Sequence, residues 1–194
     1  MLSERGQHFL QALKRREVPI DPIEVAELLR SRKLPAPDAI LAIQETYGGC
    51  TFHAGLQPLV ATILLPRADY LRDQAWTAPD VTTESGELMF RCFDTLSQCE
   101  FHLDQQGVFF ENWKPVHVNF DHVIESKALL AGLSQHGVWK QTDARNEFSD
   151  PASFPKAGFQ RDEAASCRYT SWWRNEDTLV QWRSKDVTIW TRTE

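Results

Sequence analysis

The spacing of apolar residues predicts helices at the start of the chain, strands in the middle, one further helix and a last set of strands. A first helix is predicted over residues 4–17, ending in basic residues that suit the helix dipole. A second begins after Asp21, a good N-cap that is followed by a proline at the first helical position. A third covers residues 37–47, and Gly48 suits the left-handed position that ends a helix. The side chains expected to face inward from these helices are Phe9, Leu10, Leu13, Val25, Leu28, Leu29, Ile40, Ile43 or Gln44, and Tyr47.

Beyond residue 50 the pattern alternates as it does in strands. Strands are predicted within residues 59–66, 87–96, 99–104 and 108–113, and again within 169–174, 178–184 and 187–193. Residues 67–86 and 140–167 are polar and predicted to be irregular. Between the two sets of strands lies a predicted helix, capped by Asn119 or Asp121, with Phe120, Val123, Ile124 and Leu130 facing inward.

This order of elements predicts an α+β fold. N-terminal helices and one later helix are expected to pack on a mostly antiparallel or mixed sheet, with an added C-terminal Trp-rich β-meander. We divide the chain into a core of residues 1–136 and an extension of residues 137–194, which we expect to pack on the same domain.

The lack of export and membrane signals predicts a cytoplasmic domain, and no cofactor is expected. The 194 residues are 42% hydrophobic, enough for a core, yet no apolar stretch approaches the length of a membrane span. The N-terminus lacks the continuous apolar segment of a secretory signal. The four cysteines contain no C-x-x-C pair, and we interpret them as reduced, buried small side chains rather than metal ligands. They are Cys50, Cys92, Cys99 and Cys167.

The net charge of −6 is concentrated in the middle of the chain. Residues 34–136 contain five Lys/Arg and thirteen Asp/Glu, a balance of −8, whereas residues 1–33 are at +2 and residues 137–194 are neutral. Phosphate binding needs a basic surface, so this argues against nucleic acid as a direct ligand and favours a basic partner. The alternative is that the acidity serves only solubility.

One set of residues suggests catalysis. Glu100, His102 and Asp104 would project from one face of a strand, where they could bind a metal or transfer protons. An exposed strand face of mixed charge explains the same pattern. The sequence holds no zinc-protease, nucleophile-elbow, P-loop or dinucleotide motif, so we expect no enzyme and assign no catalytic residue.

Four of the seven tryptophans lie in the last strands, at Trp172, Trp173, Trp182 and Trp190. They could form an interface hot spot, or they could pack inside the molecule. Because Trp172 and Trp173 are adjacent, they must point to opposite faces of a strand. We therefore expect one to be buried, and the other, exposed or covered by another element, is an interface candidate.

Three stretches together resemble the SUKH superfamily. "LP…ILAIQETYGG" is similar to its short helix that ends on an aromatic residue and two glycines. "LMFRCFDTLSQCEFHLDQQGVFFENW" is similar to its strands with a D-x-x-G hairpin, and "HVNFDHVIESKALLAGL" to its closing helix. The resemblance covers about residues 20–135, and the Trp-rich end has no counterpart. It implies a non-enzymatic bacterial immunity protein that neutralises a cognate toxin, in many cases a nuclease, by tight stoichiometric binding.

An acidic immunity protein suits a toxin with a basic surface, because its charge can steer association and cover the toxin's active site. A SUKH-like regulatory module without a toxin and, less favoured, a small hydrolase are the alternatives. No membrane partner is expected, and a homodimer stays open. The residues expected to contact the partner are Asp69, Asp73, Asp80, Glu84, Glu100, Asp104, Glu111, Trp172 and Trp173.

Overall fold

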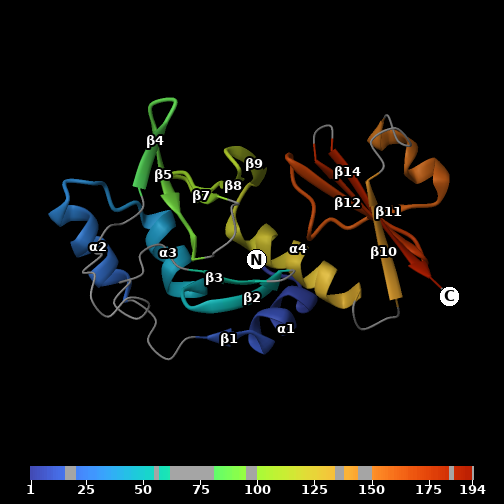
Figure 1. The fold of residues 1–194 in the computed structure, drawn as a ribbon, viewed down its shortest axis with the longest axis horizontal. Coiled ribbons are helices and arrows are strands. Elements are labelled where there is room, and N and C mark those ends of the chain that lie inside the picture. Colours follow the sequence, from blue (N-terminus) through green and yellow to red (C-terminus); the bar gives the residue numbers. More distant parts are fainter. Residues whose placement is uncertain are drawn as a thin grey trace. The chain divides into compact units, whose positions relative to one another are not determined.

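The computed structural model describes residues 1–15, 21–54, 57–61, 81–94, 100–133, 138–143, 150–183 and 186–193 (Figure 1). In these residues the chain forms four α-helices and three antiparallel sheets, which confirms the predicted α+β fold. The C-terminal strand meander is also present. The chain divides into two compact units: a middle unit, Ala12–Pro115, and a terminal unit, Met1–Gln11 with Val116–Glu194.

The described residues of the middle unit form two helices and two sheets. Its elements are β1 (Lys14–Arg15), α2 (Pro22–Ser31), α3 (Asp38–Tyr47), β2 (Cys50–Ala54), β3 (Gln57–Ala61), β4 (Val81–Glu84), β5 (Glu87–Arg91), β6 (Phe93–Asp94), β7 (Phe101–Leu103), β8 (Phe109–Glu111) and β9 (Lys114–His117), whose last residues belong to the terminal unit. One sheet has the strand order β1-β2-β3-β6, and the other has the order β4-β5-β7-β8-β9.

Helix α2 begins as its sequence predicts. Asp21 is the N-cap, and its side-chain oxygen accepts a hydrogen bond from the backbone N–H of Ile23 at 2.8 Å. This bond satisfies one of the donors that the first turn leaves free. Val25 and Leu29 are fully buried on the inner face, while Leu28 is only half-buried.

The end of α3 differs from the prediction by one residue. Gly48 has an extended conformation (φ −54°, ψ 132°), and Gly49 takes the left-handed one (φ 80°). The shift lets the N–H of Gly49 donate to the carbonyl oxygen of Ala61 in β3 at 2.8 Å, so that the chain passes directly into the sheet. Gly48 is still required, because a Cβ there would collide with the carbonyl oxygen of Gln44. Of the two alternatives at the middle of the inner face, Gln44 is buried together with Ile40 and Tyr47, and Ile43 is only half-buried.

Three segments form strands where other structure was predicted. Lys14–Arg15 pairs with Cys50–Thr51 instead of ending the first helix, and a guanidinium N–H of Arg15 donates to the carbonyl oxygen of Thr46 at 2.7 Å. Val81–Glu84 and Val138–Asp143 are strands within or beside segments predicted to be irregular. Both pair along their length with a neighbouring strand, and such tertiary pairing overrides a weak local pattern.

Phenylalanine rings fill the core of the middle unit. Phe93 contacts Phe52, Phe101 and Phe109 edge-to-face, with ring centroids 5.6, 5.3 and 5.9 Å apart. All four rings are buried. Each such pair is worth about 0.5–1.5 kcal/mol beyond the burial of its area. The antiparallel meander predicted around these residues is confirmed by the pairing of β5 with β7 and of β7 with β8.

In the terminal unit the described residues form two α-helices, two short 3-10 helices and one sheet. Its elements are α1 (Glu4–Ala12, whose last residue lies at the boundary), α4 (Phe120–Leu133), β10 (Val138–Asp143), two short 3-10 helices (Pro151–Ser153 and Pro155–Ala157), β11 (Gln160–Arg161), β12 (Thr170–Arg174), β13 (Thr178–Arg183) and β14 (Asp186–Thr193). The strand order is β10-β14-β13-β12-β11, and every pairing is antiparallel.

Helix α4 packs on the C-terminal sheet through Trp172. This side chain has no exposed area, and its indole N–H donates to the hydroxyl of Ser126 on α4 at 3.0 Å. Trp190 stacks against it at 5.6 Å, and Leu129 of α4 belongs to the same cluster. The helix that the sequence analysis assigned to the core of residues 1–136 therefore lies in one unit with the strands of the extension.

The other face of this sheet carries a second aromatic cluster. Phe154, from the segment of 3-10 helices, is fully buried and stacks on Trp173 at 5.4 Å. Phe159 and Trp182 lie edge-on to Phe154 at 5.6 and 6.0 Å. The prediction that Trp172 and Trp173 point to opposite faces is confirmed: Trp172 is fully buried, whereas Trp173 is half-buried and stacks on Phe154.

A buried ion cluster joins three distant segments of the terminal unit. Arg5 of α1 donates to the carboxylate of Asp162 at 2.6 and 3.0 Å and to Glu125 of α4 at 3.1 Å. The hydroxyl of Ser3 also donates to Glu125, at 2.8 Å, and Glu125 is only 2% exposed. Burial alone would raise the pKa of Asp162, but the hydrogen bond and charge of Arg5 lower it below its usual value. We call Arg5, Glu125 and Asp162 the Arg5 cluster.

A substitution at Gly6 tests how closely α1 packs against the Arg5 cluster. A Cβ at Gly6 would collide with the Glu125 carboxylate, whereas a Cβ at Gly132 of α4 would meet nothing within 4 Å. Gly6→Ala should therefore lower the free energy of unfolding by about 1–3 kcal/mol. The matched control, Gly132→Ala, should raise it by up to about 1 kcal/mol, because alanine favours the helix. Urea unfolding of both variants checks this, and equal effects at the two glycines would contradict the packing.

His117 should make the terminal unit sensitive to mild acid. Burial lowers its pKa well below the ordinary value of 6.5, and the positive charges of Arg183, His122 and Lys127 lower it further. Near pH 6.5 the imidazole of His117 is protonated in the unfolded chain but stays neutral in the folded chain. The free energy of unfolding should therefore be highest above about pH 6.5 and fall as the pH drops below that value.

The loss should be at most about 1.4 kcal/mol per pH unit for this group, and His117→Gln should reduce the slope. Unfolding free energies followed by tryptophan fluorescence at pH 7.5 and pH 5.5 measure it. Identical slopes in the parent and the variant would show that His117 does not carry the effect.

Candidate interaction surface

The structure separates the carboxylates that the sequence nominated as one contact surface. Asp69, Asp73 and Asp80 lie outside the described residues. Glu84 and Glu100 are exposed, Glu111 is partly exposed, and Asp104 is buried. The contact surface is therefore defined below from the strands that carry the described carboxylates.

The register of the second sheet places Glu84 far from Glu100. Glu84 pairs with Glu87 at the turn between β4 and β5, whereas Glu100 directly precedes β7, whose His102 pairs with Arg91 at the other end of β5. Four residues of strand, or roughly 13 Å, separate Glu87 from Arg91. Phe101 pairs with Glu111, so Glu111 lies at the same end as Glu100. The described carboxylates thus form two separate groups.

Asp104 stabilises a turn and is not available as a contact residue. One of its carboxylate oxygens accepts hydrogen bonds from the backbone N–H groups of Gln106 and Val108, both at 2.9 Å. Gly107 follows in the left-handed conformation (φ 82°). An aspartate that accepts from backbone two residues ahead is a common way to build a tight turn. Its nomination as a partner contact was wrong, because the alternating pattern stops at the turn.

The three residues considered for catalysis have three different environments. They are Glu100, His102 and Asp104. Glu100 is exposed, the ring of His102 is buried and stacks on Trp113 at 4.3 Å, and Asp104 holds the turn. In the described part of the chain no group of three or more His, Cys, Asp or Glu side chains could hold a metal ion. Cys50 and Cys92 are buried, as predicted, and burial raises the pKa of both thiols.

The most unusual described feature of the middle unit is the turn between β8 and β9. Asn112 and Trp113 occupy it with φ values of 48° and 66°. Two residues of positive φ make the preferred two-residue hairpin turn, in which the second position is normally glycine. A tryptophan there carries a backbone strain of roughly 1–2 kcal/mol.

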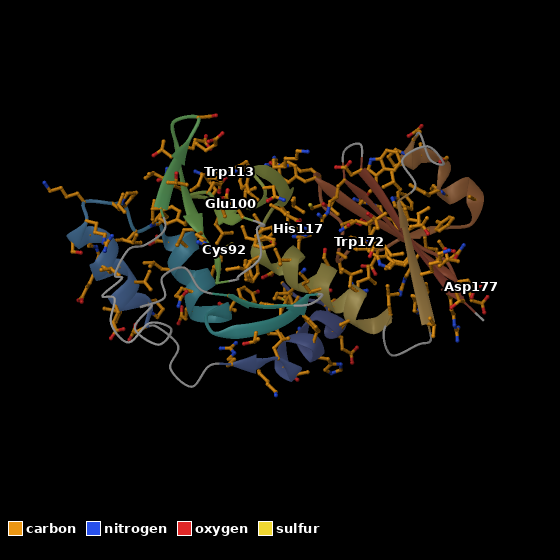
Figure 2. The ribbon with its side chains drawn as sticks, in the orientation of Figure 1. Cys92, Glu100, Trp113, His117, Trp172 and Asp177 are labelled. Carbon is orange, nitrogen blue, oxygen red and sulfur yellow. The ribbon has the colours of Figure 1, made fainter. Side chains whose placement is uncertain are left out.

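Neighbouring groups hold this turn in place. The backbone N–H of Asn112 donates to the carbonyl oxygen of Glu100 at 2.8 Å, and the Asn112 side chain accepts from the Glu100 N–H at 3.1 Å. The Trp113 ring lies nearly parallel to the His102 ring, and Figure 2 shows Trp113 beside Glu100. One backbone–backbone hydrogen bond, one hydrogen bond to the Asn112 side chain and one ring contact therefore hold the strained turn.

Trp113 is also exposed. Among the described residues the exposed large hydrophobic side chains are Met1, Ile23, Trp113 and Val138, and Trp113, at 37%, is the aromatic one. Tryptophan is the residue type most enriched in interface hot spots. Glu100 and Glu111 flank it with negative charge. We define Glu100, His102, Glu111, Asn112 and Trp113 as the Trp113 surface.

The two tryptophans nominated as partner contacts take part in the packing of the terminal unit. Trp172 is a core residue, and Trp173 stacks on Phe154, so the terminal sheet uses both for its own packing. The missed signal was Asn112-Trp113 between "VFFE" and "KPVH". Asparagine followed by a residue where glycine is expected marks a two-residue hairpin with an unusual second position.

In the described part of the chain, no helix combines the length and the apolar composition that crossing a bilayer requires. Comparison with protein-family models, with curated proteins and with solved structures finds no match to this chain.

The strain at Trp113 can be measured directly. Trp113→Gly should unfold at a free energy within about 1 kcal/mol of the parent, because relief of the positive φ offsets the lost stacking. Trp113→Ala should be less stable than Trp113→Gly by about 1 kcal/mol, since alanine keeps the strain and loses the ring. Thermal unfolding compares them, with Trp172→Ala as the core control, expected to cost about 3–5 kcal/mol. An alanine variant as stable as the glycine variant would contradict the left-handed turn.

Proposed function

We propose that this protein is an immunity protein that neutralises a basic toxin in the bacterial cytoplasm by stoichiometric binding. The resemblance of residues 20–135 to the SUKH superfamily and the balance of −8 over residues 34–136 support the proposal. The observation that carries it is the Trp113 surface. There an exposed aromatic side chain is held in a strained turn between carboxylates.

Strain and exposure at one residue have a physical meaning for binding. Trp113 carries two energetic costs: its positive φ would be less strained at a glycine, and its exposed ring would be more stable when removed from water. A partner that buries Trp113 removes the cost of exposing the ring to water. The fixed turn reduces the conformational entropy that is lost on association. Glu100 and Glu111 then supply negative charge at the rim, where it raises the association rate for a basic partner.

The hairpin of β4 and β5 supplies a second acidic contact. Residues 82–87 are all exposed, and Figure 1 shows this hairpin projecting beyond the other labelled strands of the middle unit. Glu84 and Glu87 face each other across the strands, an arrangement of like charges that destabilises a hairpin. In the described residues neither carboxylate has a hydrogen-bond or ion-pair partner. A basic partner would relieve this repulsion.

Two other functions make different predictions. A SUKH-like regulatory module would bind a cellular protein through the same surface without protecting against a toxin. A small hydrolase would need Glu100, His102 and Asp104 to act together on a substrate.

The first experiment is co-expression with the product of the neighbouring upstream gene. A stable 1:1 complex that restores growth against that product's toxicity supports the proposal. A complex without toxicity favours the regulatory module. Absence of both, with each protein folded, overturns the immunity function.

The charge of the Trp113 surface should control the association rate. Glu100→Lys/Glu111→Lys should slow association with the co-expressed toxin at least about tenfold at low salt and reduce its salt dependence. Trp113→Gly should instead mainly accelerate dissociation, because it removes contact area rather than charge. Surface plasmon resonance at two salt concentrations measures both rates.

Glu176→Lys/Asp177→Lys is the matched control for the charge reversal. These two carboxylates are also exposed and adjacent, but they lie at the turn between β12 and β13 in the terminal unit (Figure 2, Asp177). The control should leave association within about twofold of the parent if the Trp113 surface is the contact. Equal slowing by the two double reversals would mean that net charge, and not this surface, guides binding.

A further inference from the structure

The indole ring of Trp113 has one covered face and one open face. The His102 ring covers the inner face, with 4.3 Å between the ring centroids and 24° between the ring planes. The Trp113 residue is still 37% exposed. In the part of the chain that the structure describes, no second ring and no cation contacts the indole. The outer face is therefore an aromatic surface that is open to a ligand and held at a fixed angle by the histidine below it.

The Glu100 carboxylate lies on the same side of the sheet as this ring. Glu100 directly precedes β7, and the alternation of the strand places its side chain on the face that carries His102. Figure 2 shows Glu100 beside Trp113. The turn uses only the backbone of Glu100, whose N–H and carbonyl oxygen bond to Asn112. Among the described residues the exposed Glu100 carboxylate has no hydrogen-bond or ion-pair partner.

The other charges near the turn have different positions. Glu111 pairs with Phe101, so its side chain points to the opposite face of the sheet. The two-residue turn sets Lys114 opposite Glu111, on that same face. Arg91 lies in β5, which is on the far side of β7 from the turn. Glu100 is therefore the described residue that supplies charge beside the open ring face.

We propose that the Trp113 surface binds an arginine side chain of its partner, with the guanidinium stacked on the outer face of Trp113 and hydrogen-bonded to the Glu100 carboxylate. A planar guanidinium can stack on an aromatic ring and donate two parallel hydrogen bonds to a carboxylate at the same time. A lysine ammonium is a compact, strongly hydrated point charge and offers neither the flat face nor the paired donors. The site thus selects arginine over lysine.

This inference rests on the proposed function for the identity of the partner, since a basic toxin presents arginine on its surface. The arginine itself follows from the site. An open aromatic face attracts a cation, and a carboxylate without a partner at its edge complements the same charge. Because the His102 ring already fixes the indole, little freedom of the Trp113 side chain is lost when the guanidinium stacks.

Nuclear magnetic resonance of the free protein tests the site with a defined probe. The probe is the peptide N-acetyl-Gly-Arg-Gly-amide, and its matched control contains lysine in place of arginine. The indole N–H signal of Trp113, one of seven tryptophans, is assigned by its loss in Trp113→Gly. This signal should shift saturably with the arginine peptide, and the lysine peptide should bind at least about threefold more weakly. The arginine side-chain protons should move upfield, because stacking places them over the ring.

A charge-neutral substitution tests the role of the carboxylate. Glu100→Gln keeps the backbone bonds of the turn and should weaken binding of the arginine peptide about threefold or more. Glu176→Gln makes the same change at an exposed residue of the terminal unit and should leave binding unchanged. Absence of a saturable shift in the parent, equal binding of the two peptides, or equal weakening by the two substitutions would each overturn the proposal.

The peptide titration and the growth assay fail independently. No toxin is present in the titration, so loss of arginine binding would overturn this inference even if the protein protects cells. Arginine binding without protection would instead contradict the immunity function and leave the arginine site established.

Discussion

The terminal unit depends on the Arg5 cluster, because this cluster is where the beginning, the middle and the end of the chain meet. Arg5 lies in the first helix, Glu125 in α4, and Asp162 beside the C-terminal sheet, and hydrogen bonds of 2.6–3.1 Å join the three. Removing one member would leave a buried charge without its partner, which is more costly than never having had the pair. Gly6 belongs to the same constraint, since only a residue without a Cβ lets α1 approach the Glu125 carboxylate. The N-terminal helix is thus part of the C-terminal fold.

The two units use aromatic residues in opposite ways. In the terminal unit Trp172 and Trp173 are committed to the two faces of one sheet, and α4 and Phe154 cover them. In the middle unit the phenylalanine rings are buried in the core. Trp113, in contrast, is exposed in a turn whose backbone would be less strained with glycine. Burial in the first case supports the fold itself. Exposure under strain in the second is the observation from which we propose a contact outside the chain.

Local signals in the sequence were sufficient to predict much of this architecture. The N-cap at Asp21, the period change after residue 50 and the alternating tryptophans predicted α2, the central meander and the C-terminal meander. Strand pairing was harder to predict. Lys14–Arg15 and Val81–Glu84 have only weak strand patterns in their sequences, and they form strands because they pair with β2 and β5. The same reason explains why the packing of α4 on the C-terminal sheet was not predicted, since the sequence of a helix shows its apolar face but not the sheet that covers it. Asp104 was misplaced because alternation cannot show where a strand gives way to a turn.

Hydrogen–deuterium exchange on the complex with the co-expressed partner would show whether the Trp113 surface binds that partner. We expect backbone amides of residues 100–103 and 109–114 to exchange more slowly in the complex, with the hairpin of β4 and β5 protected to a lesser degree. Protection confined to the terminal unit, with residues 109–114 unchanged, would contradict it.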